Sequence, residues 1–108
     1  MKDTTWAEFL FHDIDKMYDP RTIKAATTRT LYWVNTNRTK QGRKPLARLP
    51  RGVRYSIREN PVALGLGHAD VGLAAVARDG KTELWFLPNA VIRFLQLFHD
   101  GYLPDLES

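Results

Sequence analysis

The sequence contains no cysteine, and this absence excludes several kinds of site at once. A disulfide framework, a thiolate-bound zinc ion, an iron–sulfur cluster and a cysteine nucleophile all need thiols. The chain also has no uncharged run near the roughly 20 residues that a membrane-spanning helix requires. Its first residues, Met-Lys-Asp-Thr-Thr-Trp, do not have the pattern of a secretory signal peptide. We therefore expect a cytoplasmic protein with no membrane contact.

Residues that carry catalytic chemistry are also scarce. Ser56 and Ser108 are the only serines, and neither lies in a nucleophile elbow. Each of the three histidines has a carboxylate nearby in the sequence, but no two histidines have the spacing of a helical metal-ligand pair. Residues 65–72 are rich in glycine, yet they lack the spacing and the lysine of a phosphate-binding loop. We predict no enzyme, no metal ion and no cofactor.

Composition is that of an ordinary globular chain, but the charge is unevenly distributed. The 108 residues are 44% hydrophobic and 26% charged, which suits one domain, 1–108, with its own core. The formal net charge is only +4. Residues 1–20 carry a net charge of −3 and residues 59–108 one of −4, whereas residues 21–58 contain eleven basic residues and no acid.

An acid-free basic segment indicates an anionic partner, because a solvated surface normally intersperses charges of both signs. Eight of the eleven bases are arginine, whose guanidinium group makes forked hydrogen bonds to phosphate. A solvated basic tail would also explain the charge, but this segment is rich in apolar residues such as Leu31, Trp33 and Val53. Basic charge interleaved with aromatic rings favours nucleic acid as the partner.

Two helices are predicted in the first third of the chain. Residues 5–18 begin with a capping-box pair and carry apolar residues at helical spacing. Asp19-Pro20 is an N-cap followed by a proline at the first helical position, so a second helix should run from 20 to about 35. Its many threonines are mediocre helix formers, and residues 29–35 could instead alternate as a strand.

The middle of the chain predicts a loop and then strands. Residues 36–52 contain two glycines and two prolines and are expected to form a basic loop or arm. Residues 53–58 alternate between apolar and polar side chains, as in a half-buried strand with its arginines on the open face. Residues 62–69 could be a short strand or a tight connection. Asp79-Gly80 lies between two apolar segments and predicts a hairpin.

The last helix is predicted over residues 89–99, after Pro88 and before Gly101. Its apolar stripe is wide, so the helix should be either deeply buried or shared with a second copy in a homodimer. Together these elements predict an α+β fold. It would have a small antiparallel sheet of three to four strands, packed by the N-terminal helices and one C-terminal helix.

The candidate site follows from the charge. If residues 20–35 are helical, residues that grip or read DNA from a groove cover its polar side. These are Arg21, Lys24, Thr28, Arg29, Tyr32 and Asn35. The arm would track phosphates or enter a minor groove. The full set of expected phosphate-binding or nucleic-acid-binding residues is Arg21, Lys24, Arg29, Tyr32, Arg38, Lys40, Arg43, Lys44, Arg48, Arg51, Arg54 and Arg58. Trp33 and Tyr55 are candidates for base stacking, with a core position as the other interpretation of Trp33.

One local pattern resembles a known family. Arg51-Gly-Val-Arg54 at the start of a strand, followed by a hairpin and a C-terminal helix, is similar to the three-stranded DNA-binding domains of the integrase arm type. The resemblance covers residues 51–100. It implies a sheet in the major groove with Arg51, Arg54 and Arg58 facing DNA.

The leading hypothesis is therefore a non-enzymatic nucleic-acid-binding protein, with DNA favoured, that acts as a small regulator or accessory factor. The alternative is a protein-interaction module, an inhibitor or adaptor, whose basic face docks on an acidic partner protein. The acidic ends of the chain and the broad apolar helix suit that alternative.

Overall fold

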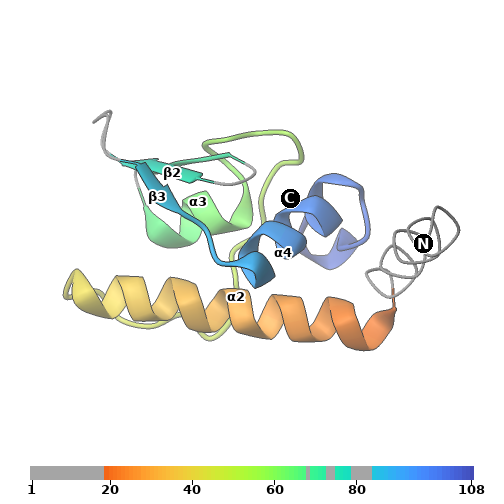
Figure 1. Cartoon of the computed structure of the whole chain (residues 1–108), viewed down its shortest axis with the longest axis horizontal. Helices are drawn as coiled ribbons and strands as arrows, with labels where there is room; N and C mark the ends of the chain where they lie inside the picture. Colours follow the sequence, from red (N-terminus) through yellow and green to blue (C-terminus); the bar gives the residue numbers. More distant parts are fainter. Residues whose placement is uncertain (1–18, 68, 73–74, 79–83) are drawn as a thin grey trace, which may run out of the picture.

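The computed structural model describes residues 19–67, 69–72, 75–78 and 84–108 (Figure 1). Its elements, in chain order, are helix α2 (Pro20–Lys40), helix α3 (Pro61–Leu66), strands β1 (Ala69–Val71), β2 (Ala75–Arg78) and β3 (Leu84–Phe86), helix α4 (Asn89–His99) and the short 3-10 helix η1 (Pro104–Leu106). The predicted helix over 5–18 and the predicted turn at Asp79-Gly80 lie outside the described residues.

Helix α2 starts as predicted but runs five residues further than expected. The Asp19 carboxylate accepts a hydrogen bond from the Arg21 backbone N–H at 2.8 Å, and Pro20 occupies the first turn. Its threonines do not end the helix, and Thr27 and Thr36 donate their hydroxyl hydrogens to the Ile23 and Tyr32 carbonyls one turn back. The first residues of the predicted arm are therefore helical, and the chain leaves α2 only after Lys40.

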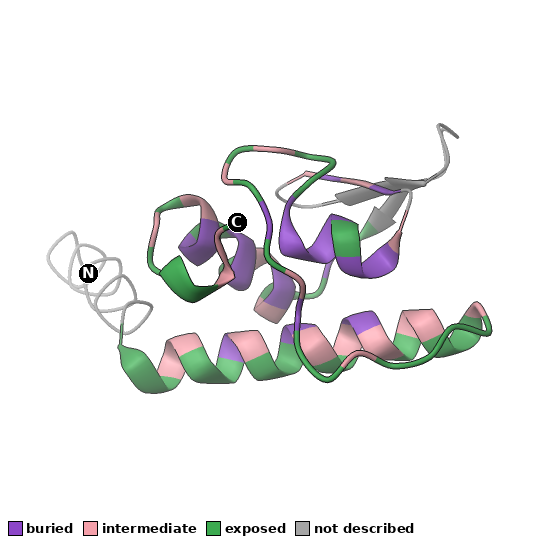
Figure 2. Cartoon of the chain, turned by 180° about the vertical axis from the view of Figure 1, so that it is seen from behind, coloured by how far each residue is buried: buried purple, intermediate pink, exposed green. Residues whose placement is uncertain are grey.

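Helix α4 has the predicted bounds and forms the centre of the core. Five of its apolar residues are at most 1% exposed, and α4 packs against α2 (Figure 2). These residues are Val91, Phe94, Leu95, Leu97 and Phe98. Burial within the chain thus accounts for these five residues of the apolar stripe, whereas Ile92 is only partly buried.

Helix α3 stands where a short strand or tight connection was expected. Asn60 caps it by accepting from the Ala63 N–H at 2.9 Å, and Pro61 follows as the first helical residue. Gly65 lets α3 approach α2 closely, since a Cβ there would lie 2.9 Å from the buried Val34 methyl group. The missed signal was the Asn-Pro pair, which has the same form as Asp19-Pro20.

The predicted α+β fold class is wrong, because the described chain is mostly helical. Its α-helices are 21, 6 and 11 residues long, whereas its strands have only 3, 4 and 3 residues. The strands form an antiparallel ladder in the order β1-β2-β3, with Val76 opposite Trp85 in the β2–β3 pair. Packing of α2 against α4 and α3 organises the fold, and α3 in turn contacts β1.

The predicted strand over residues 53–58 is also wrong. The apolar residues expected to face inward are exposed. Val53, Tyr55 and Ile57 are exposed by 44%, 74% and 54%, while Arg54 and Ser56 turn inward. Arg54 turns inward because its guanidinium Nε donates to the His99 carbonyl at 2.8 Å. Tyr55 adopts a left-handed backbone conformation with φ of 61°, which a strand does not contain. Without this strand, the structural basis for the integrase-arm resemblance is lost.

Candidate nucleic-acid interface

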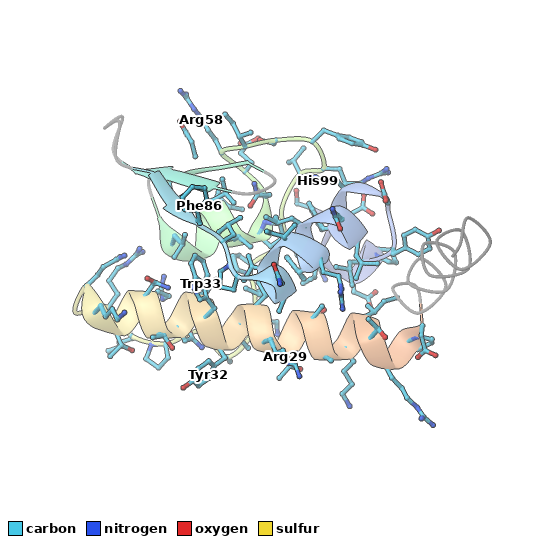
Figure 3. All side chains as sticks on the ribbon, in the orientation of Figure 1. Arg29, Tyr32, Trp33, Arg58, Phe86 and His99 are labelled. Atoms are coloured by element: carbon cyan, nitrogen blue, oxygen red, sulfur yellow. The ribbon has the colours of Figure 1, made fainter. Side chains whose placement is uncertain are left out.

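The outer face of α2 is a basic surface that is exposed to solvent. After Pro20, the exposed residues of α2 are Arg21, Lys24, Ala25, Thr28, Arg29, Tyr32, Thr36, Thr39 and Lys40. No acid occurs between Pro20 and Lys40. Arg29 and Tyr32 point away from α3 and α4 (Figure 3). We call these nine residues the α2 outer face.

The inner side of α2 explains why this face is fixed in orientation. Ala26, Thr30 and Val34 are buried at 4%, 0% and 0% exposure, and they follow one another at intervals of four residues. Their burial orients the helix, because any rotation about its axis would expose them. The basic residues lie on the opposite side.

The three aromatic candidates are placed very differently. Tyr32 is 76% exposed on the α2 outer face, whereas Trp33 is half-buried and packs against the core. Tyr55 lies on another part of the molecule, where its ring stacks on His99 at a centroid distance of 5.5 Å. Of the aromatic rings predicted to contact bases or phosphates, only Tyr32 shares a surface with the basic residues of α2.

Two predicted phosphate-binding arginines instead cap helix α3. Arg38 donates from Nη1 to the Gly65 carbonyl at 2.8 Å and from Nε to the Lys44 carbonyl at 2.7 Å. Arg43 donates from Nη1 to the Leu66 carbonyl at 2.7 Å. The last carbonyls of a helix have no partner within it and carry partial negative charge, so guanidinium groups stabilise them.

Two further arginines of the predicted set, Arg54 and Arg58, have partners outside α2. Arg54 bonds the last carbonyl of α4, at His99, and its guanidinium carbon lies 5.3 Å from the centre of the Tyr55 ring. Arg58 forms an ion pair with Asp70 at 3.3 Å, although its side chain is 79% exposed. It lies far from α2 (Figure 3). The twelve predicted residues therefore do not form one continuous site.

The predicted arm is held against the protein. Asn35 donates its side-chain amide to the Leu46 carbonyl at 3.0 Å and accepts from the Leu46 N–H at 2.7 Å. Residues 41–50 consequently run back along α2 (Figure 2). Asn35 was expected on the DNA-reading side of the helix, but this pair of bonds holds it to the loop. Lys44, Arg48 and Arg51 remain exposed.

Sequence reasoning missed one basic residue next to α2. Arg93 of α4 lines a groove of about 330 Å³ together with residues from the first half of α2. The lining residues are Arg21, Thr22, Ala25, Ala26, Arg29, Asn89, Ala90 and Arg93. We call this space the arginine groove. Arg93 was overlooked because the charge was summed by segment, and it belongs to a segment that is acidic overall.

A second cavity, of about 310 Å³, lies beside the Tyr55–His99 stack. It is lined by Tyr55, Ser56, Ile57, Val71, Gly72, Gln96, His99 and Asp100. His99 Nδ1 accepts from the Tyr55 backbone N–H at 2.8 Å. Burial lowers the pKa of His99 below its usual 6.5. Asp100 raises this pKa in part, and Arg54 lowers it further. The imidazole is thereby favoured in the neutral form that this hydrogen bond requires.

Comparison with protein families, curated proteins and solved structures finds no match for this chain. The described helices include none that combines the length and apolar character needed to cross a membrane.

Proposed function

We propose that this protein binds double-stranded DNA through the α2 outer face, as a small non-enzymatic regulator or accessory factor. The observation that carries the proposal is a 21-residue helix with no acid whose outward side is open to solvent. Arg21, Lys24 and Arg29 supply cations over its first ten residues, and Lys40 supplies one at its end.

The dimensions of α2 suit a duplex. Twenty-one helical residues span about 31 Å at 1.5 Å per residue. A major groove about 12 Å wide accepts an α-helix. Ala25 and Thr28 lie between the basic residues of this face and have short side chains. They therefore allow the backbone of α2 to approach the groove. Arg29 and Tyr32 are then positioned to contact a phosphate or a base edge.

The first test measures fluorescence anisotropy of a labelled 20-base-pair duplex against salt concentration. Four cations on the face predict a slope of log K against log salt of about −3.6. Single-stranded DNA and RNA of the same sequence serve as competitors. A dissociation constant weaker than about 10 µM for every nucleic acid at low salt would discard the proposal, because even nonspecific cation–phosphate binding reaches that range.

Matched charge-neutralising variants locate the surface. Arg29→Gln should weaken duplex binding by about three- to tenfold and reduce the salt slope by about 0.9. Arg58→Gln removes the same charge from the far side of the molecule and should change neither quantity. Equal losses in both variants would show that the contact is not confined to α2.

The same assay distinguishes nucleic-acid binding from the alternative, in which the protein docks on an acidic partner protein. In that case the basic face would bind an acidic polypeptide, such as poly-glutamate, with no affinity for nucleic acid. Binding to poly-glutamate alone, sensitive to Arg29→Gln, would select the alternative. A cytoplasmic location stays a prediction from the sequence.

A further inference from the structure

Arg54 and Tyr55 are attached to the end of helix α4 through a single residue, His99. The His99 carbonyl accepts a hydrogen bond from Arg54 Nε at 2.8 Å, and His99 Nδ1 accepts one from the Tyr55 backbone N–H at 2.8 Å. The Tyr55 ring also stacks on the His99 ring, with centroids 5.5 Å apart and planes inclined by 16°. We call Arg54 and Tyr55 the latch.

The residues on either side of the latch are held by other parts of the chain. The Val53 N–H donates to the Glu59 carbonyl at 2.8 Å. Asn60, which is buried, donates its side-chain amide to the Ser56 carbonyl at 2.8 Å. Neither bond involves α4, so the latch can leave the helix end while its neighbours keep their places.

The backbone of Tyr55 favours such a release. Its φ of 61° lies in the left-handed region, and it is the one described residue other than glycine with a positive φ. This conformation is unfavourable for a bulky side chain. The Tyr55 ring is 74% exposed, so core packing does little to hold it. The contacts with His99 therefore keep Tyr55 in a conformation that it would otherwise leave.

Protonation of His99 turns two of these contacts from attractive to repulsive. In the neutral imidazole, Nδ1 accepts from the Tyr55 N–H and the proton lies on Nε2. A second proton on Nδ1 would point toward the Tyr55 N–H, so that two donors would face each other. The imidazolium would also repel the Arg54 guanidinium group, which is bonded to the carbonyl of the same histidine.

The charged groups that act on His99 come from α4 and from the latch. Burial lowers the pKa of His99 below its usual 6.5, Asp100 raises this pKa in part, and Arg54 lowers it further. On the other side of the adjoining cavity, Gln96 of α4 and Val71 of β1 are uncharged. His99 is therefore neutral above pH 6.5 and gains its second proton on acidification below that value.

The cavity beside the ring stack depends on the position of the latch. Tyr55 and His99 both line this space of about 310 Å³. A movement of Tyr55 away from His99 therefore changes the shape of the cavity.

We propose that Arg54 and Tyr55 form a pH-sensitive latch, in which protonation of His99 releases both residues from the end of α4 and reshapes the cavity beside them, while the helices stay folded. This device does not depend on nucleic-acid binding, so it stands or falls separately from the proposed function.

Nuclear magnetic resonance of the labelled full chain tests the latch between about pH 7.5 and about pH 5. The chemical shifts of the His99 ring protons follow its protonation, and nuclear Overhauser effects between the Tyr55 and His99 rings report the closed latch. We expect these effects to be present at the higher pH and lost as His99 becomes protonated. The backbone signals of α2 and α4 should persist over the whole range.

Three variants assign the effect. His99→Asn keeps an acceptor for the Tyr55 N–H but does not titrate, so the Tyr55 amide signal should no longer respond to pH in this range. Asp100→Asn removes the charge that favours protonation and leaves every bond of the latch in place. It should move the midpoint of release to lower pH by about 0.5 unit. Asp19→Asn, the same exchange at the cap of α2, is the matched control and should leave the midpoint unchanged.

Three outcomes would overturn the proposal. In the first, the ring contact between Tyr55 and His99 persists after His99 is protonated. In the second, the Tyr55 amide signal responds equally to pH in His99→Asn, so that another group controls the segment. In the third, the signals of α4 disappear together with the ring contact, because the change would then be general unfolding.

Discussion

At the scale of single residues, identical side chains in one basic segment have separate tasks. Arg29 faces solvent, whereas Arg38, Arg43 and Arg54 bond carbonyls at helix ends. A guanidinium group has five donors, so it serves equally well for a phosphate or for unpaired helix carbonyls. The choice depends on acceptors such as Gly65 and His99, which lie 27 and 45 residues away along the chain. From the charge of the segment alone, all four arginines were predicted to bind nucleic acid.

The residue scale also yields a pH dependence. The neutral His99 imidazole accepts from the Tyr55 N–H, and burial lowers its pKa in the folded protein below 6.5. Between that lowered pKa and 6.5 the unfolded chain binds more protons than the folded one, so the free energy of unfolding rises with pH there. Stability from this group is complete above pH 6.5 and is lost as the pH falls through the lowered pKa.

Urea unfolding at several values between pH 5 and 7.5 measures this dependence. The wild-type protein should lose stability on acidification more steeply than His99→Gln, whose side chain can accept the same bond but does not titrate. Other groups titrate alike in both proteins, so the difference between the two curves isolates His99. Parallel curves would contradict the prediction.

At the scale of elements, one buried side chain fixes helix α3. Asn60 is 0% exposed and makes three hydrogen bonds: it accepts from the Ala63 N–H and donates to the carbonyls of Ser56 and Val71. It therefore joins the start of α3 to the preceding turn and to β1. A carboxylate could accept from Ala63 but could not donate to the two carbonyls.

Asn60→Asp should consequently lower the free energy of unfolding by about 3 kcal/mol or more, since a buried carboxylate would face two carbonyl oxygens. Asp19→Asn, the reverse exchange at the exposed cap of α2, should change it by less than about 0.5 kcal/mol, because the two residues are equivalent N-caps. Chemical denaturation of both variants measures the difference. A mild effect of Asn60→Asp would mean that Asn60 serves only as a cap.

The elements also show how far sequence patterns reach. Asp19-Pro20 and residues 89–99 predicted one helix start and one complete helix, because capping and apolar periodicity are local signals. The strand predicted over residues 53–58 is wrong, because an alternating pattern forms a strand only where a partner strand supplies hydrogen bonds. Here Gly52 instead pairs with the C-terminal segment through Leu106 and Ser108. That partner cannot be seen from a window of six residues.

At the scale of the whole molecule, the charge remains unbalanced after folding. Among the residues that the structure describes, Arg58–Asp70 is the only ion pair, although eleven bases lie between residues 21 and 58. Repulsion between the exposed cations opposes the compact state, and salt screens it. The free energy of unfolding should therefore rise by about 1 kcal/mol between low salt and about 0.3 M NaCl.

Arg48→Gln, which removes an exposed and unpaired cation from the 41–50 loop, should reduce this salt dependence. Thermal or urea unfolding in a NaCl series measures both proteins. A stability that falls with added NaCl would show that attraction between opposite charges dominates, and the description of an unbalanced surface would be incorrect.

The sequence by itself determined the helix starting at Asp19-Pro20, the helix over 89–99 and the acid-free basic segment. These depend on residue type, local capping and periodicity. Only the tertiary structure decided which cations face outward, that Trp33 joins the core, and that Arg93 lies beside the arginines of α2. Those outcomes depend on hydrogen-bond acceptors and packing surfaces supplied by distant segments, so the same arginine serves as a helix cap in one place and as a candidate phosphate contact in another.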